Sequence, residues 1–424
     1  MTFVSKLAMA AVLTLGTGAL STVPASAQKA DKKAANATPE LKVSEEFRKA
    51  AAAAETAIKA KDVATAEPQI VAAEAASKND DERYYAAWLR LQLELQRKDE
   101  AGQMKALQAL WTNPKTPADR APLYGSVYNF MAGSRAAADK KHAEAIAFLL
   151  KARELGSKEA DLPVMLANSY SASGNQPAAI AEVETAIAQS KAAGRKPPVD
   201  WYKFAIPRVN QSGDRAKMAD WLTRFIQEYP TVPNWRWAIQ VFRQGTPAGG
   251  SEKVEKLDLY RLMRATNALA DRGDYADYAF QAQQSGLPWE AVAAIDEGRK
   301  SGKIPAGDAD TGRTYTASQA AVKAEGSLDT LAKQAAAAKT GAPASQTADA
   351  FLAAGNYARA LELYDLSLTK GGVNADEVNL HRGIALHALT RKDEARTAFQ
   401  QVKSGPYSNL SLLWLASIDF PPLA

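Results

Sequence analysis

The stretch Gly355-Asn356-Tyr357-Ala358-Arg359-Ala360, with Tyr364 four residues beyond it, decides the fold of this chain. An earlier stretch, Gly174 to Ala179, begins with the same Gly-Asn pair and has Val183 four residues beyond it. In both stretches a glycine turn precedes an alanine, and a large apolar residue follows one helical turn later. This combination predicts a turn between two short helices that pack closely at the alanine.

Two further copies make the pattern periodic. Ala145, followed by Leu149, lies 34 residues before Ala179, and Ala395, followed by Phe399, lies 35 residues after Ala360. Self-similarity at this period is typical of stacked helix pairs, so the sequence predicts an all-α fold, an α-solenoid. Such a scaffold implies binding but does not identify the partner.

Nearly all of the remaining chain also has helical character, because apolar residues recur at spacings of three and four and no strand-like alternation occurs. Short turns rich in Gly, Pro, Asn and Asp separate the helices. The predicted helices span Glu45–Lys59, Val63–Ala76, Asp81–Gln96, Asp99–Trp111, Leu123–Ala138, His142–Leu155, Ala160–Ser173, Gln176–Ala192, Trp201–Gln211, Ala216–Tyr229, Asn234–Arg243, Lys253–Arg272, Tyr275–Ser285 and Pro288–Lys300, with about seven more between Thr314 and Leu423.

The segment Gly245-Thr-Pro-Ala-Gly-Gly-Ser251 has the composition of a linker. It predicts two solenoid blocks, an N-terminal one over residues 44–244 and a C-terminal one over 253–424, joined by a linker at 245–252.

The first residues predict export. Lys6 precedes an apolar stretch from Leu7 to Leu20, and Ala25-Ser26-Ala27 offers small residues at a cleavage site. This pattern is typical of a Sec-type signal peptide over residues 1–27, followed by a disordered leader at 28–43. An uncleaved membrane anchor is the alternative, although the apolar core is short for a span. The expected location is therefore the periplasm, with no stable membrane anchor after cleavage, and the source is inferred to be a Gram-negative bacterium.

Composition excludes several classes of protein. The 424 residues contain no cysteine, so disulfides, thiol nucleophiles, thiolate metal sites and a lipoprotein anchor are excluded. The 52 basic and 47 acidic residues give a net charge of +5 and are interspersed along the chain. No concentrated basic face is visible, so a nucleic-acid partner is not expected.

The repeated positions resemble the tetratricopeptide repeat family. One copy combines Ala348, Phe351, Gly355, Tyr357, Ala360, Tyr364 and Ser367; another combines Ala167, Tyr170, Gly174, Ala179, Val183 and Ala186; a third combines Gly383, Leu386, Ala395 and Phe399. About four copies are clear, and the other copies across most of the chain are degenerate. The resemblance implies a right-handed superhelix whose inner groove, lined by the first helix of each pair, binds an extended peptide or another protein's helix.

The groove-facing positions implied by this resemblance can be read from the first helices. They include Phe130 and Ser134 on one helix and Val164 and Asn168 on a later one, and Tyr84 could lie on the rim. The lysines of a carboxylate-binding subgroup are absent from these positions, whereas small and apolar residues suit a hydrophobic peptide. The alternative is that each of these side chains contacts only neighbouring helices.

A tryptophan-rich middle contains Trp201 and Trp235-Arg236-Trp237. On a helix Trp235 and Trp237 point about 200° apart, so they cannot form one stacking platform. Trp201 and Trp235 are candidate contacts for a peptide or a sugar, and core packing is the alternative.

Catalytic motifs are not evident. His381 and His387 are six residues apart, which places them on different helix faces, and His142 occupies a position suited to packing. The sequence predicts no catalytic residue, no cofactor and no metal site. A hydrolase that uses carboxylates from separate helices stays an alternative, because such pairs form in space rather than in sequence.

The sequence therefore predicts a non-catalytic periplasmic scaffold or adaptor that binds a protein or peptide partner in its groove. Analogy with the family suggests envelope assembly, secretion or polysaccharide export. The alternative is binding of a carbohydrate such as peptidoglycan or an envelope polysaccharide through the tryptophan-rich middle.

Overall fold

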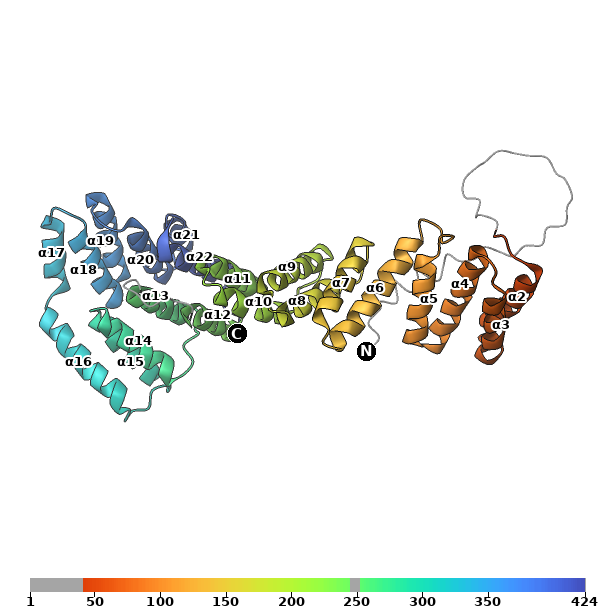
Figure 1. The fold of residues 1–424 in the computed structure, drawn as a ribbon. Helices are drawn as coiled ribbons and strands as arrows, with labels where there is room; N and C mark the ends of the chain where they lie inside the picture. The colour runs from red at the N-terminus through yellow and green to blue at the C-terminus, as the bar shows by residue number, and fades with distance from the viewer. Residues whose placement is uncertain (1–40, 245–251, 424) are drawn as a thin grey trace. The chain divides into compact units, whose positions relative to one another are not determined.

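The computed structural model describes residues 41–244 and 252–423. Within these residues the chain forms twenty-one α-helices and no β-strand, apart from an isolated bridge between Thr231 and Leu423 (Figure 1). The all-α prediction is confirmed. The predicted signal peptide, most of the predicted leader and residues 245–251 of the predicted linker lie outside the described residues. None of the described helices has the length and apolar character needed to cross a membrane.

The described chain divides into two compact units. The first unit, within residues 41–195, contains α2 (Glu45–Lys59), α3 (Val63–Ala76), α4 (Asp80–Arg97), α5 (Glu100–Thr112), α6 (Ala121–Ala138), α7 (His142–Glu154), α8 (Leu162–Ala172) and α9 (Gln176–Ala192). The second, within residues 196–423, contains α10 (Val199–Gln211), α11 (Arg215–Glu228), α12 (Val232–Gln244), α13 (Glu252–Ala265), α14 (Arg272–Gln284), α15 (Pro288–Lys300), α16 (Ala309–Glu325), α17 (Leu328–Ala337), α18 (Ala342–Ala353), α19 (Tyr357–Lys370), α20 (Ala375–Ala388), α21 (Lys392–Gln400) and α22 (Gly405–Asp419).

The Gly-Asn pair of the repeat has a clear structural role. Gly174 and Gly355 have φ angles of +80° and +76°, the left-handed region that favours glycine after a helix. The next residue caps the following helix: the side chain of Asn175 accepts from the backbone N–H of Ala178 at 3.2 Å, and that of Asn356 from Arg359 at 3.3 Å. The pair therefore ends one helix and starts the next within three residues.

The small residues of the repeat lie where helices touch. Ala145, Ala179, Ala360 and Ala395 are fully buried. A Cβ added to Gly383 would lie 2.4 Å from the ring of Phe399, which is too close for two carbon atoms. Ala167 and Tyr364 are also buried, whereas Tyr170 and Tyr357 are half-buried at the edges of their helices. Apart from α16 and α17, consecutive helices pack together through each unit, as in a helical solenoid.

The observed division differs from the predicted one. The units separate after Arg195, whereas α12 and α13, which flank the predicted linker, pack together inside the second unit. In that unit α22 packs against α11 and α13. The C-terminal tail then follows the start of α12, where the backbone N–H of Leu423 donates to Pro230 O at 2.7 Å.

Helix α13 is the central element of the second unit. The sequence predicted one helix over Lys253–Arg272, but α13 ends at Ala265, where Asn267 adopts a left-handed φ of 53°. Asp271 then caps α14 through the N–H of Asp274. Residues 257–263 are buried on every side of α13, which is a property of a helix enclosed by others rather than of one on a solenoid surface.

Candidate functional site

Four predicted groove residues of the first unit retain some exposure. Tyr84, Ser134 and Val164 are half-buried, and Asn168 is exposed. Contacts between α2 and α4 and between α6 and α8 bring first helices of successive pairs together. The hydroxyl of Ser134 lies 3.6 Å from the sulfur of Met165, a neighbour of the predicted Val164, so the predicted position on α6 directly contacts α8.

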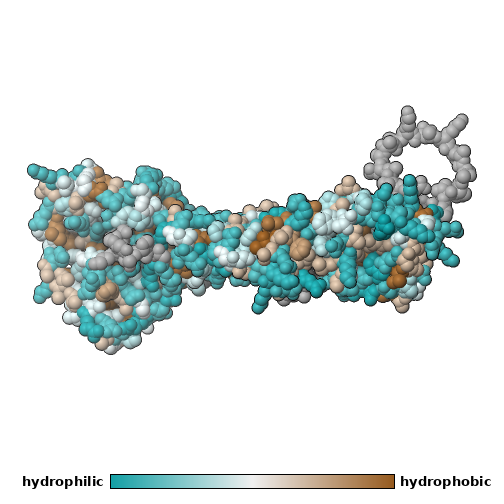
Figure 2. Space-filling view, viewed as in Figure 1, coloured by the Kyte–Doolittle hydropathy of each residue, from teal (hydrophilic) through white to brown (hydrophobic). Residues whose placement is uncertain are grey.

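Tyr84 lies at another contact between first helices. Its side chain interacts with Tyr124 on α6, close to Arg120, and burial raises the pKa of Tyr84 above its ordinary value. On the side shown in Figure 2, the surface of the first unit has apolar patches between stretches of polar side chains. We refer to Tyr84, Ser134, Val164, Met165 and Asn168 as the first-helix face.

Two predicted contact residues cannot serve as such. Phe130 is fully buried in a cluster with Leu149 and Leu166, so its place in a partner groove was wrongly predicted. Trp235 is also fully buried, and its indole N–H donates to Phe420 O at 3.3 Å. Core packing, the alternative that the sequence left open, explains both side chains. Trp201 is half-buried, so the middle segment presents no pair of exposed tryptophans to a sugar.

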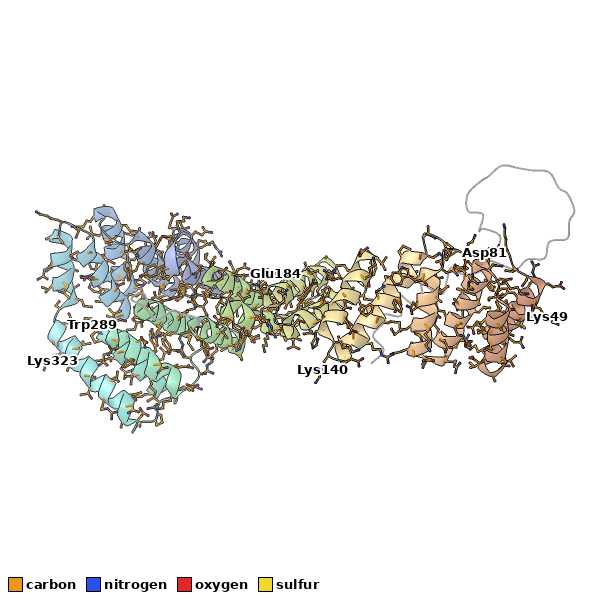
Figure 3. The ribbon with its side chains drawn as sticks, viewed as in Figure 1. Lys49, Asp81, Lys140, Glu184, Trp289 and Lys323 are labelled. Carbon is orange, nitrogen blue, oxygen red and sulfur yellow. The ribbon has the colours of Figure 1, made fainter. Side chains whose placement is uncertain are left out.

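A second candidate site lies inside the second unit. A cavity of about 520 Å³, here called the outer cavity, has walls from α13, α15, α16, α18 and the start of α19. Its lining combines the aromatic rings of Trp289 and Tyr357 with aliphatic side chains and with two cations, Arg264 and Lys323. Figure 3 shows Trp289 and Lys323 on α15 and α16, which pack side by side.

A smaller inner cavity of about 280 Å³ adjoins the outer one, because both are lined by Arg264, Ala353 and Tyr357. The inner cavity reaches α20 and α22, where His387 and Trp414 form part of its wall. Burial and the charge of Lys392 lower the pKa of His387, so this imidazole is neutral at neutral pH.

A buried ion network supports the inner cavity. Arg261 donates to both oxygens of Glu290, at 2.8 and 2.6 Å, and to Asp258 at 2.9 Å. Tyr278 adds a fourth hydrogen bond by donating to Glu290 at 2.7 Å. These groups are almost fully buried, and their mutual hydrogen bonds satisfy them as buried charges require.

His381 continues this network to the C-terminal helices. Its Nε2 lies 3.2 Å from Asp258 and its Nδ1 lies 2.8 Å from Asp349, so both ring nitrogens have carboxylate partners. Burial alone would lower the pKa of His381, but the two carboxylates outweigh burial and raise it to about 10. His381 is therefore an imidazolium that donates from both nitrogens and ties α20 to α13 and α18.

Arg261 and Arg264 are three residues apart on α13 and both line the inner cavity, but their hydrogen bonding differs. All three nitrogens of Arg261 have carboxylate partners. Arg264 contacts Glu297 through Nε at 2.7 Å, and among the described residues its two terminal nitrogens have no acceptor. Arg261 is therefore a structural group, whereas Arg264 keeps donors for a ligand.

The acidic residues around the two cavities also test the alternative that the chain is a hydrolase using carboxylates from separate helices. They bring Glu290 and Asp296 near Trp289, but both oxygens of Glu290 accept hydrogen bonds from Arg261. A carboxylate held in this way is a poor proton donor or acceptor. Among the described residues, no group of three His, Asp or Glu side chains is arranged to hold a metal ion.

Sequence reasoning missed this site. Trp414 is buried at 1 % exposure, whereas Trp289 is half-buried in a cavity wall. One local signal was available: Asp258 and Arg261 are three residues apart within the otherwise apolar run 257–263. Such a pair indicates buried charges that need partners from elsewhere in the chain.

No protein-family model and no curated protein sequence matches this chain. Among solved structures, the pentatricopeptide repeat protein PPR10 from maize aligns over 88% of this chain with 14% identity and a TM-score of 0.27. This chain spans 62% of the length of that protein. A Rap protein complexed with competence and sporulation factor aligns over 87% of this chain and 99% of its own, with 12% identity and a TM-score of 0.23.

The Cut9-Hcn1 hetero-tetramer of APC/C aligns over 88% of this chain and 84% of its own, with 12% identity and a TM-score of 0.19. Similarities at these scores assign no partner and no family to the chain. Its own helices and turns define the class: an all-α helical-repeat protein built from stacked helix pairs.

Proposed function

We propose that this protein is a non-catalytic scaffold of the periplasm that binds a protein or peptide partner on the first-helix face. The observation that carries the proposal is the contact of Ser134 on α6 with Met165 on α8, which joins successive first helices into one partly exposed surface. The surface combines aromatic, aliphatic and thioether groups with the exposed amide of Asn168. An extended apolar peptide or an amphipathic helix has the complementary chemistry.

The periplasmic part of the proposal rests on the leader pattern of residues 1–27, which is typical of a signal peptide. Envelope assembly, secretion and polysaccharide export are processes in which such an adaptor would act. Cleavage between Ala27 and Gln28 is checked by N-terminal sequencing of the protein recovered from a periplasmic extract.

Site-specific crosslinking tests partner binding. A photoreactive residue at Asn168 should crosslink a partner in intact cells, whereas one at the exposed Glu154 of α7, a second helix, should not. Val164→Glu should weaken binding of the identified partner at least 10-fold, because it buries a charge in an apolar contact.

Val71→Glu is the matched control, since Val71 is 50% exposed on α3 and lies outside the first-helix face. Equal crosslinking at both positions, or equal loss of binding in both valine variants, would contradict the proposal.

A further inference from the structure

We propose that the two adjoining cavities of the second unit form a binding site for an amphipathic monocarboxylate. The carboxylate would lie in the inner cavity against Arg264, and the elongated apolar part would lie in the outer cavity. This site belongs to the second unit alone and does not depend on the partner-binding role proposed for the first.

The size and lining of the outer cavity suit an apolar ligand. Its volume of about 520 Å³ lies within the range of about 300–1,000 Å³ typical of small-molecule sites. Trp289, Val292 and Val322 line it and are all half-buried, so they present apolar surface that a ligand would cover. Removing this surface from water is the main driving force available.

Hydrogen-bonding capacity places the carboxylate at Arg264. The ion pair with Glu297 uses only the Nε edge of the guanidinium, so four N–H donors on the terminal nitrogens have no acceptor among the described residues. A ligand carboxylate is the planar acceptor that matches such a fork. The neighbouring Arg261 cannot take this role, because Glu290 and Asp258 already occupy its three nitrogens.

The remaining groups of the cavities favour one orientation of the ligand. Asp296 lines the outer cavity and would repel a carboxylate there, and the same lining contains one lysine, Lys323. In the inner cavity the charge of Glu290 is paired with Arg261, and neutral His387 repels neither end of a ligand. The indole N–H of Trp414, a residue of the same wall, has no acceptor among the described residues.

Titration calorimetry on the full chain tests the site with decanoate, used below the concentration at which it forms micelles. We expect saturable binding with one site per chain, and binding at least 10-fold weaker for decan-1-ol, which lacks the carboxylate. A factor of 10 corresponds to about 1.4 kcal/mol. The shorter 3-phenylpropanoate, which fills only one of the cavities, should also bind more weakly than decanoate.

Two variants separate the two parts of the site. Arg264→Gln should weaken decanoate binding at least 10-fold and leave decan-1-ol unchanged, and Ala293→Phe, which fills the outer cavity, should weaken both. Arg313→Gln is the matched control, because Arg313 is an exposed arginine of α16 outside both linings. Circular dichroism confirms that each variant is folded.

Three results would overturn the inference. The first is the absence of saturable decanoate binding at millimolar concentration. The second is equal affinity for decanoate and decan-1-ol, or no effect of Arg264→Gln, either of which removes the carboxylate contact. The third is equal affinity for decanoate and 3-phenylpropanoate together with no effect of Ala293→Phe, which removes the outer cavity from the site.

Discussion

At the scale of single residues, Gly383 shows why the repeat requires a small side chain. The space that a Cβ would need at this position is occupied by the ring of Phe399, with the nearest ring atoms at 2.4 and 2.6 Å. Phe399 is itself fully buried, and it stacks on Trp414 with 5.7 Å between ring centroids, so it cannot move aside without disturbing a second ring.

Gly383→Ala should therefore destabilise the second unit by about 1–3 kcal/mol, the usual cost of overpacking a dense core. Urea unfolding, followed by tryptophan fluorescence, measures the change in the free energy of unfolding. Gly312→Ala is the control, because Gly312 lies in α16 with nothing within 4 Å of an added Cβ and alanine favours a helix. Equal stability of the two variants would show that Phe399 relaxes freely.

At the scale of helix packing, the ion network of His381, which links α20 to α13 and α18, makes the free energy of unfolding depend on pH. The folded-state pKa of His381 is raised from an ordinary 6.5 to about 10 by Asp258 and Asp349, against the opposing effect of burial. A raised pKa means that the folded state binds the proton more tightly than the unfolded state does. Its contribution to stability is therefore fully present below pH 6.5 and is lost as pH rises through about 10.

His381→Gln should cost about 3–5 kcal/mol at pH 6, because it removes the cation that bridges the buried Asp258 and the half-buried Asp349. The difference in unfolding free energy between wild type and variant should shrink steadily from pH 6 to pH 10. A difference that stays constant with pH would mean that His381 is not the titrating group.

The helix bounds and the two cavities show which features the sequence could predict and which it could not. The bounds of α9 and α15 were predicted at both ends, because the signals are local: a capping Asn175 in one and Pro288 at the start of the other. The end of α13 was missed, since Asn267 can adopt either a helical or a left-handed conformation and no Gly or Pro lies beside it. The cavities were missed because their chemistry is non-local: His381 pairs with Asp258 across 123 residues of sequence.

At the scale of the whole molecule, the packing of α22 against α11 and α13 determines where the chain can be cut into separately folding parts. Helix α22 packs on α11, and the C-terminal tail satisfies the buried indole of Trp235 on α12. Helices α11 and α12 therefore depend on residues about 190 positions later in the chain, although the Gly245–Ser251 composition predicted a boundary before that point. A glycine-rich segment signals a break in helix, which is not the same as a break between units.

Fragments of the chain test this division. The fragment 41–195 should fold alone and unfold cooperatively, because it contains every helix of the first unit. The fragment 41–244 should in addition carry α10 to α12 without α13 and α22, which would expose Trp221, Trp235 and Phe242, all fully buried in the whole chain. Exposed apolar surface of this kind favours aggregation.

Size-exclusion chromatography and limited proteolysis compare the two fragments. We expect a monodisperse, protease-resistant 41–195, and a 41–244 that aggregates or is trimmed back toward residue 195, while 196–424 folds as a complement to the first. Stable, separately folded 41–244 and 253–424 fragments would instead place the boundary at the predicted linker. In that case the contact of α22 with α11 would contribute little to the fold, and the 253–424 fragment would retain the cavity site, whose lining residues all lie within it.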